Sequence, residues 1–115
     1  MSYEMNIRYF RLFICLACMA FSYHAAAIEL EVNLTIKNHR FEPVELKVPA
    51  NQKVKLIVIN QDDSAEEFES YSLNREKLVP ANGKAVIFIG PLKPGRYDFF
   101  GEFNQSTAKG AVVVE

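Results

Sequence analysis

The sequence predicts an all-β domain, a Greek-key sandwich or barrel of seven or eight short strands. From residue 32 onward, short segments in which apolar and polar residues alternate are separated by turn residues, and this is the pattern of strands with one buried face. A Pro94-Gly95 turn leads into Tyr97. A tyrosine that opens a late strand is typical of β-sandwiches, where its hydroxyl bonds the backbone of the preceding loop. No segment in this part of the chain carries a clear helical pattern.

The first 27 residues have the composition of a secretory signal peptide. Arg8 and Arg11 come before an apolar run, Leu12–Phe21, and small residues follow at Ala25–Ala27. The run is shorter than the roughly 20 residues that a membrane-spanning helix needs. We therefore expect cleavage after residue 27, a mature domain at residues 28–115, and a periplasmic location. Two alternative interpretations stay open: Cys18 could be a lipoprotein cysteine, and Met5 could be the first residue.

Cleavage at this point would change the chemistry that the chain can offer. Both cysteines, all three methionines and one of the two histidines precede residue 28, so His39 would be the remaining imidazole. The mature part would carry 11 Lys and Arg against 13 Asp and Glu, a net charge of −2. This balance argues against a nucleic-acid-binding surface and against a polybasic membrane patch. It would also contain no disulfide and no thiol nucleophile.

Strands and turns can be assigned in order along this region. Pro43 stands at the start of the second strand, where it removes no ladder hydrogen bond, and the third strand becomes apolar on both faces, as a central strand does. Tyr71–Val79 is ambiguous, with a turn or a short helix at Leu73–Glu76. Asn82-Gly83 signals a hairpin. The expected strands are Val32–Ile36, Val44–Val48, Lys53–Asn60, Ala85–Ile89, one that begins at Tyr97, and Ala111–Val114. The expected core aromatics are Phe41, Phe88, Tyr97 and Phe99.

Two stretches resemble the cupredoxins, the small copper-protein sandwiches. The first is Phe41–Asn60, and the second, Tyr97–Gly110, keeps the frame of the loop that carries three copper ligands in that family. The ligands themselves are replaced: Gly101 stands at the Cys position, Asn104 at the His position and Ala108 roughly at the Met position, while the first His falls at Glu66 or Glu67. A blue-copper centre needs two His and a thiolate. The resemblance therefore implies a cupredoxin fold without a blue-copper centre.

Further segments resemble a particular group within the cupredoxin-like domains. Glu67–Ser70, Asn74–Lys77, Pro91–Gly95 and Phe100–Phe103 are similar to EfeO-type domains and to the small periplasmic cupredoxins that accompany Ftr-type iron permeases in bacteria. In that group carboxylates take over from the blue-copper ligands. The resemblance implies binding of a copper or iron ion and delivery of iron to the permease, with oxidation of Fe²⁺ as a further option. Because those proteins often carry His where this chain has Asn104, a site here is expected to be weaker and to use harder ligands.

Glu67, Glu69 and Glu102 are the strongest candidate metal ligands. On a strand, residues i and i+2 lie roughly 6.5 to 7 Å apart on one face, so Glu67 and Glu69 would point outward together if Phe68 points into the core. Glu102 lies in the loop that carries ligands in relatives, and the fold should bring the three carboxylates to one end of the sandwich. Such oxygen donors suit Fe²⁺, Fe³⁺, Mn²⁺ or Cu²⁺. The alternative is a solvated acidic edge.

Asn104 and His39 are weaker candidate ligands. Asn104 offers an amide oxygen, and His39 lies in a turn that would have to open toward the same end as Glu102. A turn histidine that is only solvated is the alternative. Glu76, next to Arg75, is expected in a surface ion pair.

The leading hypothesis is a periplasmic metal-binding accessory protein of a ferrous-iron uptake system, whose partner is an iron permease or another inner-membrane transport component. One alternative is a metal-free interaction module that docks on a permease or an oxidase. Another is a stand-alone ferroxidase that oxidises Fe²⁺ with copper. The sequence shows no nucleophile–base pair and no phosphate loop, so hydrolysis and group transfer have no support.

Overall fold

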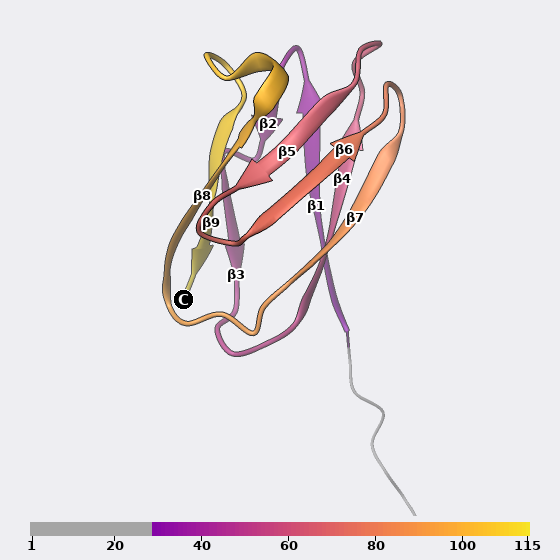
Figure 1. Cartoon of the computed structure of the whole chain (residues 1–115). Coiled ribbons are helices and arrows are strands. Elements are labelled where there is room, and N and C mark those ends of the chain that lie inside the picture. The colour runs from indigo at the N-terminus through magenta and orange to yellow at the C-terminus, as the bar shows by residue number, and fades with distance from the viewer. Residues whose placement is uncertain (1–28) are drawn as a thin grey trace, which may run out of the picture.

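The computed structural model describes residues 29–115, so the predicted signal peptide lies outside the described residues. This part of the chain forms nine strands and one 3-10 turn, arranged as two sheets packed face to face (Figure 1). The elements are β1 (Leu30–Lys37), β2 (Arg40–Glu42), β3 (Glu45–Val48), β4 (Val54–Asn60), β5 (Glu66–Ser70), β6 (Arg75–Val79), β7 (Lys84–Ile89), β8 (Gly95–Gly101), η1 (Glu102–Asn104) and β9 (Lys109–Val114).

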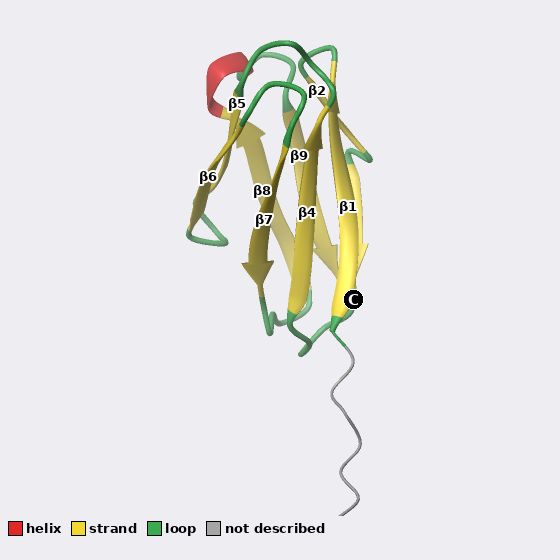
Figure 2. Cartoon of the chain, turned by 90° about the vertical axis from the view of Figure 1, so that its right-hand side faces the viewer, coloured by secondary structure: helices red, strands yellow, loops and turns green. Residues whose placement is uncertain are grey.

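The sheets are mixed, with strand order β2-β1-β4-β7 in one and β3-β9-β8-β5-β6 in the other. β1 runs parallel to β4 and β3 runs parallel to β9, while the other pairs are antiparallel. Figure 2 shows the four-stranded sheet in front of β8 and β9, with η1 at the end opposite the start of β1. No helix in residues 29–115 is long and apolar enough to cross a membrane. The all-β sandwich predicted from the sequence is confirmed.

The structure contains one or two strands more than predicted because the chain changes sheets at Pro43. β2 pairs with β1, whereas β3, which follows Pro43, pairs with β9 in the other sheet. A proline cannot donate a ladder hydrogen bond, so the gap between two strands is a site where it costs nothing. The stretch Phe41–Val48 thus ties the two sheets together.

The ambiguous segment Tyr71–Val79 forms a turn followed by β6. Asn74 adopts φ of 52°, a left-handed conformation that asparagine tolerates better than most residues. The turn is short enough to pair β5 with β6 directly, and Glu69 lies opposite Glu76 in the resulting hairpin. A helix at Leu73–Glu76 is therefore excluded.

The core between the sheets is centred on three phenylalanine rings. Phe41 packs edge-on against Phe99 and Phe68, with ring centroids 4.9 and 6.2 Å away, and Phe68 lies 5.1 Å from Phe99. All three side chains are buried. The prediction of Phe88 as a core residue was wrong, because β7 turns Ala85, Ile87 and Ile89 inward and leaves Phe88 outside beneath the Lys53 ammonium group.

Side-chain hydrogen bonds of Tyr97 and Asn60 fix the loops at opposite ends of the sandwich. The Tyr97 hydroxyl donates to the Lys93 carbonyl (2.9 Å), as the tyrosine-corner pattern predicted. At the other end the buried Asn60 side chain donates to the Ser64 carbonyl and accepts from the Asp62 backbone N–H. Asn60 thereby shapes the loop that leads into β5.

The aromatic cluster predicts a large difference between two phenylalanine truncations. Phe41→Ala should lower the free energy of unfolding by about 3 to 5 kcal/mol, because it leaves a cavity among rings that cannot collapse freely. Phe103→Ala is the matched control: that ring is 54% exposed, and its loss should change stability by no more than about 0.5 kcal/mol. Urea denaturation measures both values. Similar losses in the two variants would contradict this description of the core.

Candidate metal site and the filled ligand pole

An acidic cluster on the outer face of β5 and β6 follows from the two-residue period of β5. Phe68 is fully buried, so Glu67 and Glu69 on either side of it point outward and are half-buried. Carboxylate oxygens of Glu67, Glu69 and Glu76 all lie within 4.8 Å of one another. The structure thus brings two of the predicted ligands together and adds Glu76 to them.

The expected surface ion pair between Glu76 and Arg75 was wrong. The Arg75 guanidinium instead donates to backbone carbonyls, including that of Phe88 on the neighbouring β7 (2.9 Å). Adjacent residues of a strand point to opposite faces, so Arg75 turns toward β7 while Glu76 faces Glu69. Among residues 29–115 the ion pairs join Lys55 to Glu31 and Arg96 to Glu45 and Asp98, and none of them neutralises the cluster.

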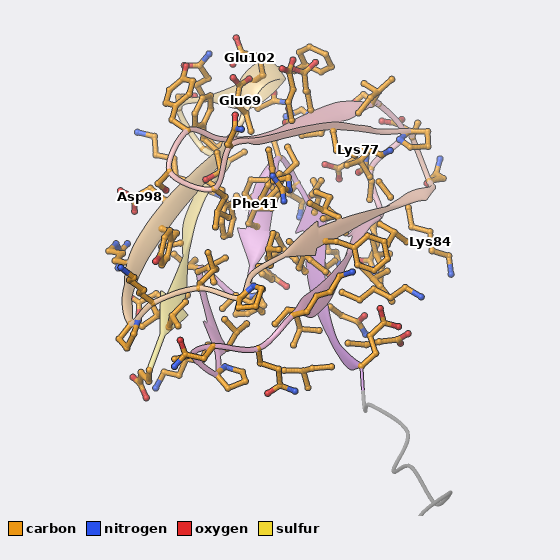
Figure 3. All side chains as sticks on the ribbon, turned by 60° about the horizontal axis from the view of Figure 1, so that its bottom comes forward. Phe41, Glu69, Lys77, Lys84, Asp98 and Glu102 are labelled. Carbon is orange, nitrogen blue, oxygen red and sulfur yellow. The ribbon has the colours of Figure 1, made fainter. Side chains whose placement is uncertain are left out.

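Glu102 stands at the rim of this cluster. It is the first residue of η1, which directly follows β8, and β8 is the neighbour of β5. Figure 3 shows Glu102 and Glu69 on the same side of the molecule, away from Lys77 and Lys84. After partial burial and the charge of Glu76, the charge of Glu102 and a hydrogen bond with it also raise the pKa of Glu69. The convergence of these two carboxylates agrees with the sequence-based geometry, whereas metal ligation by them stays a prediction.

The proximity of the carboxylates changes their acidity. A hydrogen bond with Glu76 raises the pKa of Glu67 to about 7, and partial burial and repulsion by Glu76, Glu69 and Glu102 act in the same direction. Partial burial and the charges of Glu76 and Glu102 likewise raise the pKa of Glu69. A bound cation would relieve the same repulsion that a shared proton relieves.

His39 lies in a different local environment. It occupies the β1–β2 turn with φ of 57°, and its backbone N–H donates to the Asp62 carboxylate (3.0 Å), which lowers the pKa of Asp62. Its imidazole Nε2 is 3.5 Å from the Ser64 hydroxyl. The β1–β2 turn and η1 lie at the same end of the sandwich (Figure 1), but His39 does not belong to a group of potential metal ligands within the described residues.

Asn104 faces a residue that sequence reasoning missed as a site residue, Glu66. The Glu66 side chain is 98% buried, since only 2% of the residue is exposed. Its carboxylate accepts hydrogen bonds from the Asn104 side-chain amide (2.7 Å) and from the backbone N–H groups of Phe103 (2.9 Å) and Glu67 (3.0 Å). The alternation that turns Glu67 outward also turns Glu66 inward, so the signal was present in the sequence.

The Glu66 side chain fills the space where the cupredoxin resemblance would place copper. A Cβ atom on Gly101 would lie 2.6 Å from Glu66 Cδ and 2.8 Å from Ala108 Cβ. Gly101 and Ala108 offer no donor side chain, and both oxygens of Glu66 already accept hydrogen bonds. We call this end of the interior, formed by Glu66, Gly101, Asn104 and Ala108, the interior pole. Its side chains do not fit a blue-copper ion, which needs imidazole and thiolate ligands.

The chemistry available to this end of the domain is therefore divided. Inside, the Glu66 carboxylate accepts three hydrogen bonds and is shielded from water. Outside, three to four carboxylates without a partner cation offer hard oxygen ligands of the kind that divalent cations such as Mn²⁺ and Fe²⁺ accept.

The raised pKa of Glu67 predicts how stability depends on pH. Below the ordinary value of 4.5 the carboxyl is protonated in both states, and as the pH rises toward about 7 the unfolded chain loses its proton first. Stability should therefore fall across this window and level off above it. The free energy of unfolding of Glu67→Gln, measured by urea denaturation, should decrease less from about pH 5 to about pH 8 than that of the wild type.

Glu42→Gln is the matched control for this measurement, because it removes an exposed carboxylate on β2, outside the cluster. It should keep the wild-type slope between these pH values. A wild-type slope that survives in Glu67→Gln would contradict the assignment.

Comparison with solved structures places this fold among copper-protein domains. The chain is similar to the metal-binding domain of the Streptococcus pneumoniae Cu(I)-exporting P-type ATPase CopA, with a TM-score of 0.68, 13% identity, and coverage of 80% of this chain and 91% of that domain. Auracyanin A, a blue copper protein from Chloroflexus aurantiacus, matches with a TM-score of 0.66, 14% identity, and coverage of 76% and 100%. A chain of a heme-copper terminal oxidase matches with a TM-score of 0.63, 12% identity, and coverage of 99% and 98%. At such identities the likeness shows the shared fold.

Sequence comparison identifies the family. An uncharacterised protein of Rickettsia prowazekii is 49% identical over 85 residues, which cover 74% of this chain and 68% of that protein. The family model of the cupredoxin-like domain matches residues 10–114 of the sequence. Together with the two-sheet fold, this match shows that the chain belongs to the cupredoxin-like domain family.

Proposed function

We propose that this protein is a periplasmic cation-binding accessory protein of a ferrous-iron uptake system, and that it holds the cation on the outer face of β5 and β6. The observation that carries the proposal is the group of Glu67, Glu69 and Glu76, whose carboxylate oxygens lie within 4.8 Å of one another. Glu102 would complete the ligand set from η1. Fe²⁺ and Cu²⁺ are the ions that we propose for it.

The electrostatics of the cluster support cation binding. Like charges that lie directly opposite each other on neighbouring strands destabilise a sheet, and Glu69 and Glu76 form such a pair. With the pKa of Glu67 raised to about 7, its carboxyl would keep a proton up to about neutral pH. A divalent cation would neutralise more than one of these charges at once, and its binding would release that proton.

The place of the cluster supports a role in transfer to a partner. It lies on the outside of a hairpin whose second strand, β6, is the edge of its sheet. An ion held by carboxylates that solvent can reach exchanges with solvent and can pass to ligands of another protein. We propose that the partner is an iron permease or another inner-membrane transport component.

Calorimetric titration with Mn²⁺, with Fe²⁺ under anaerobic conditions and with Cu²⁺ tests the site. The wild type should bind one ion, and Glu67→Gln or Glu76→Gln should weaken binding by about tenfold or more, a loss of about 1.4 kcal/mol or more. His39→Ala should bind as the wild type does. Glu42→Gln is the matched carboxylate control and should also leave the affinity unchanged.

Absence of binding with all three ions would remove the proposal. Binding that persists unchanged in the Glu67→Gln/Glu76→Gln double variant would place the ion elsewhere.

A second candidate function, a metal-free interaction module, is favoured by an exposed aromatic groove next to the cluster. The groove has a volume of about 550 Å³, and its walls include Val44, Tyr71, Phe100 and Lys109. Tyr71 is 79% exposed, and its ring centroid lies 5.5 Å from that of Phe100. Tyr71 also borders the hollow that contains Glu69 and Glu76. Aromatic and acidic groups together suit a partner segment with apolar and basic side chains.

Site-specific crosslinking in cells tests this second function. A photoreactive residue in place of Tyr71 should crosslink to an inner-membrane transport protein in the absence of added metal. The same residue in place of Phe88, an exposed ring on the other sheet, is the matched control and should give no such product. Equal products at both positions, or products at Phe88 alone, would count against docking through the groove.

A further inference from the structure

At the interior pole next to η1, Glu66, Gly101 and Ala108 are in close contact. Gly101 is the last residue of β8 and lies next to the Glu66 carboxyl. A Cβ atom on Gly101 would come within 2.6 Å of Glu66 Cδ. Ala108, which is also buried, closes the other side. The side chain of Glu66 therefore both packs against Gly101 at this pole and accepts its hydrogen bonds.

The hydrogen bonds of Glu66 replace contacts that η1 cannot make by itself. The first N–H groups of a helical turn have no partner within the turn, and a side chain at the N-cap often accepts from them. The N-cap of η1 is Gly101, which has no side chain to do so. Glu66 reaches across from β5 and accepts from Phe103, the second residue of η1.

The same carboxylate orders the rest of the loop through Asn104. The Asn104 amide donates to Glu66 Oε2 (2.7 Å), while the Asn104 carbonyl accepts from the backbone N–H groups of Thr107 and Ala108. The N–H of Gly101 then donates to the Ala108 carbonyl (2.9 Å) and closes the loop. Glu66 thus connects β5 to a loop that returns on itself before β9.

We propose that Glu66 ties this loop to β5 in place of a metal ion, so that the interior pole is closed to transition metals. The loop resembles the ligand loop of a metal-binding sandwich. The Glu66 carboxylate, which accepts hydrogen bonds from three N–H groups, occupies the position that a metal ion would need. A metal at this point would meet the N–H donors of Phe103, Asn104 and Glu67, which repel a cation. This inference is independent of the proposed function: a cation on the outer face neither requires the tie nor excludes it.

Hydrogen exchange of the purified protein, followed by NMR after EDTA treatment, tests the tie. The Phe103 amide should be protected in the metal-free wild type. Glu66→Ala should accelerate its exchange by about tenfold or more, the equivalent of about 1.4 kcal/mol, and leave the β4 amide of Leu56 unchanged. Glu66→Gln, which keeps one acceptor oxygen, should retain most of the protection. Glu67→Ala, the neighbouring outward carboxylate, is the matched control and should behave as the wild type does.

Titration with Cu²⁺ and Zn²⁺ in a Glu67→Gln/Glu69→Gln/Glu76→Gln background tests the closure. Any binding that remains should be the same when Glu66→Gln is added to this background, because Glu66 is not a ligand. Three results would overturn the inference: loss of Phe103 protection on EDTA treatment, unchanged exchange in Glu66→Ala, or binding that disappears with Glu66→Gln. If Glu66→Ala does not fold, the titration decides, because the triple-Gln background keeps Glu66.

Discussion

The two-residue period of β5 is the constraint on which both halves of the candidate site depend. Phe68 is locked into the aromatic core against Phe99 and Phe41, and this fixes the rotation of the whole strand. Glu66 must then point inward and Glu67 and Glu69 outward. A shift of one residue would bury two carboxylates and expose the ring, which the core energetics forbid. One packing contact therefore assigns an interior role to one glutamate and an exterior role to two others.

The outer cluster and the inner carboxylate show two physical solutions for negative charge in a β-sheet. Glu66 is desolvated, and three N–H donors compensate the lost water. Glu67, Glu69 and Glu76 remain partly hydrated but repel one another. A hydrogen bond with Glu76 raises the pKa of Glu67 and partial burial raises that of Glu69, and the repulsion adds to both shifts. The first arrangement is complete within the domain. The second is incomplete, since protonation or an external cation is required to relieve the repulsion, and this difference is why we propose ligand binding on the outer face.

The fold forms although the loop near η1 carries Gly101, Asn104 and Ala108, none of which is the Cys, His or Met that the cupredoxin pattern has at those positions. Its order comes from the buried core between the sheets and from polar ties such as Tyr97 to Lys93 and Asn60 to Ser64. At the pole near η1, the carboxylate of Glu66 occupies the position where the cupredoxin pattern would place a metal ion. On the surface next to that pole, the exposed ring of Tyr71 and the half-buried ring of Phe100 lie beside the acidic cluster and give this surface both charge and apolar area.

Much of this protein is determined by local sequence. Alternating polarity and turn residues predicted the β-sandwich, Pro94-Gly95 with Tyr97 predicted the corner, and the spacing of Glu67 and Glu69 predicted a shared face, because each is a property of a few neighbouring residues. Tertiary structure decided the rest. Glu76 lies in the cluster because of the β5–β6 register. Phe88 points outward because Ala85, Ile87 and Ile89 of β7 point into the core. Glu66 contacts Phe103 and Asn104, which are 37 and 38 residues away along the chain. Contacts between distant segments depend on how the sheets pack, and no local pattern encodes them.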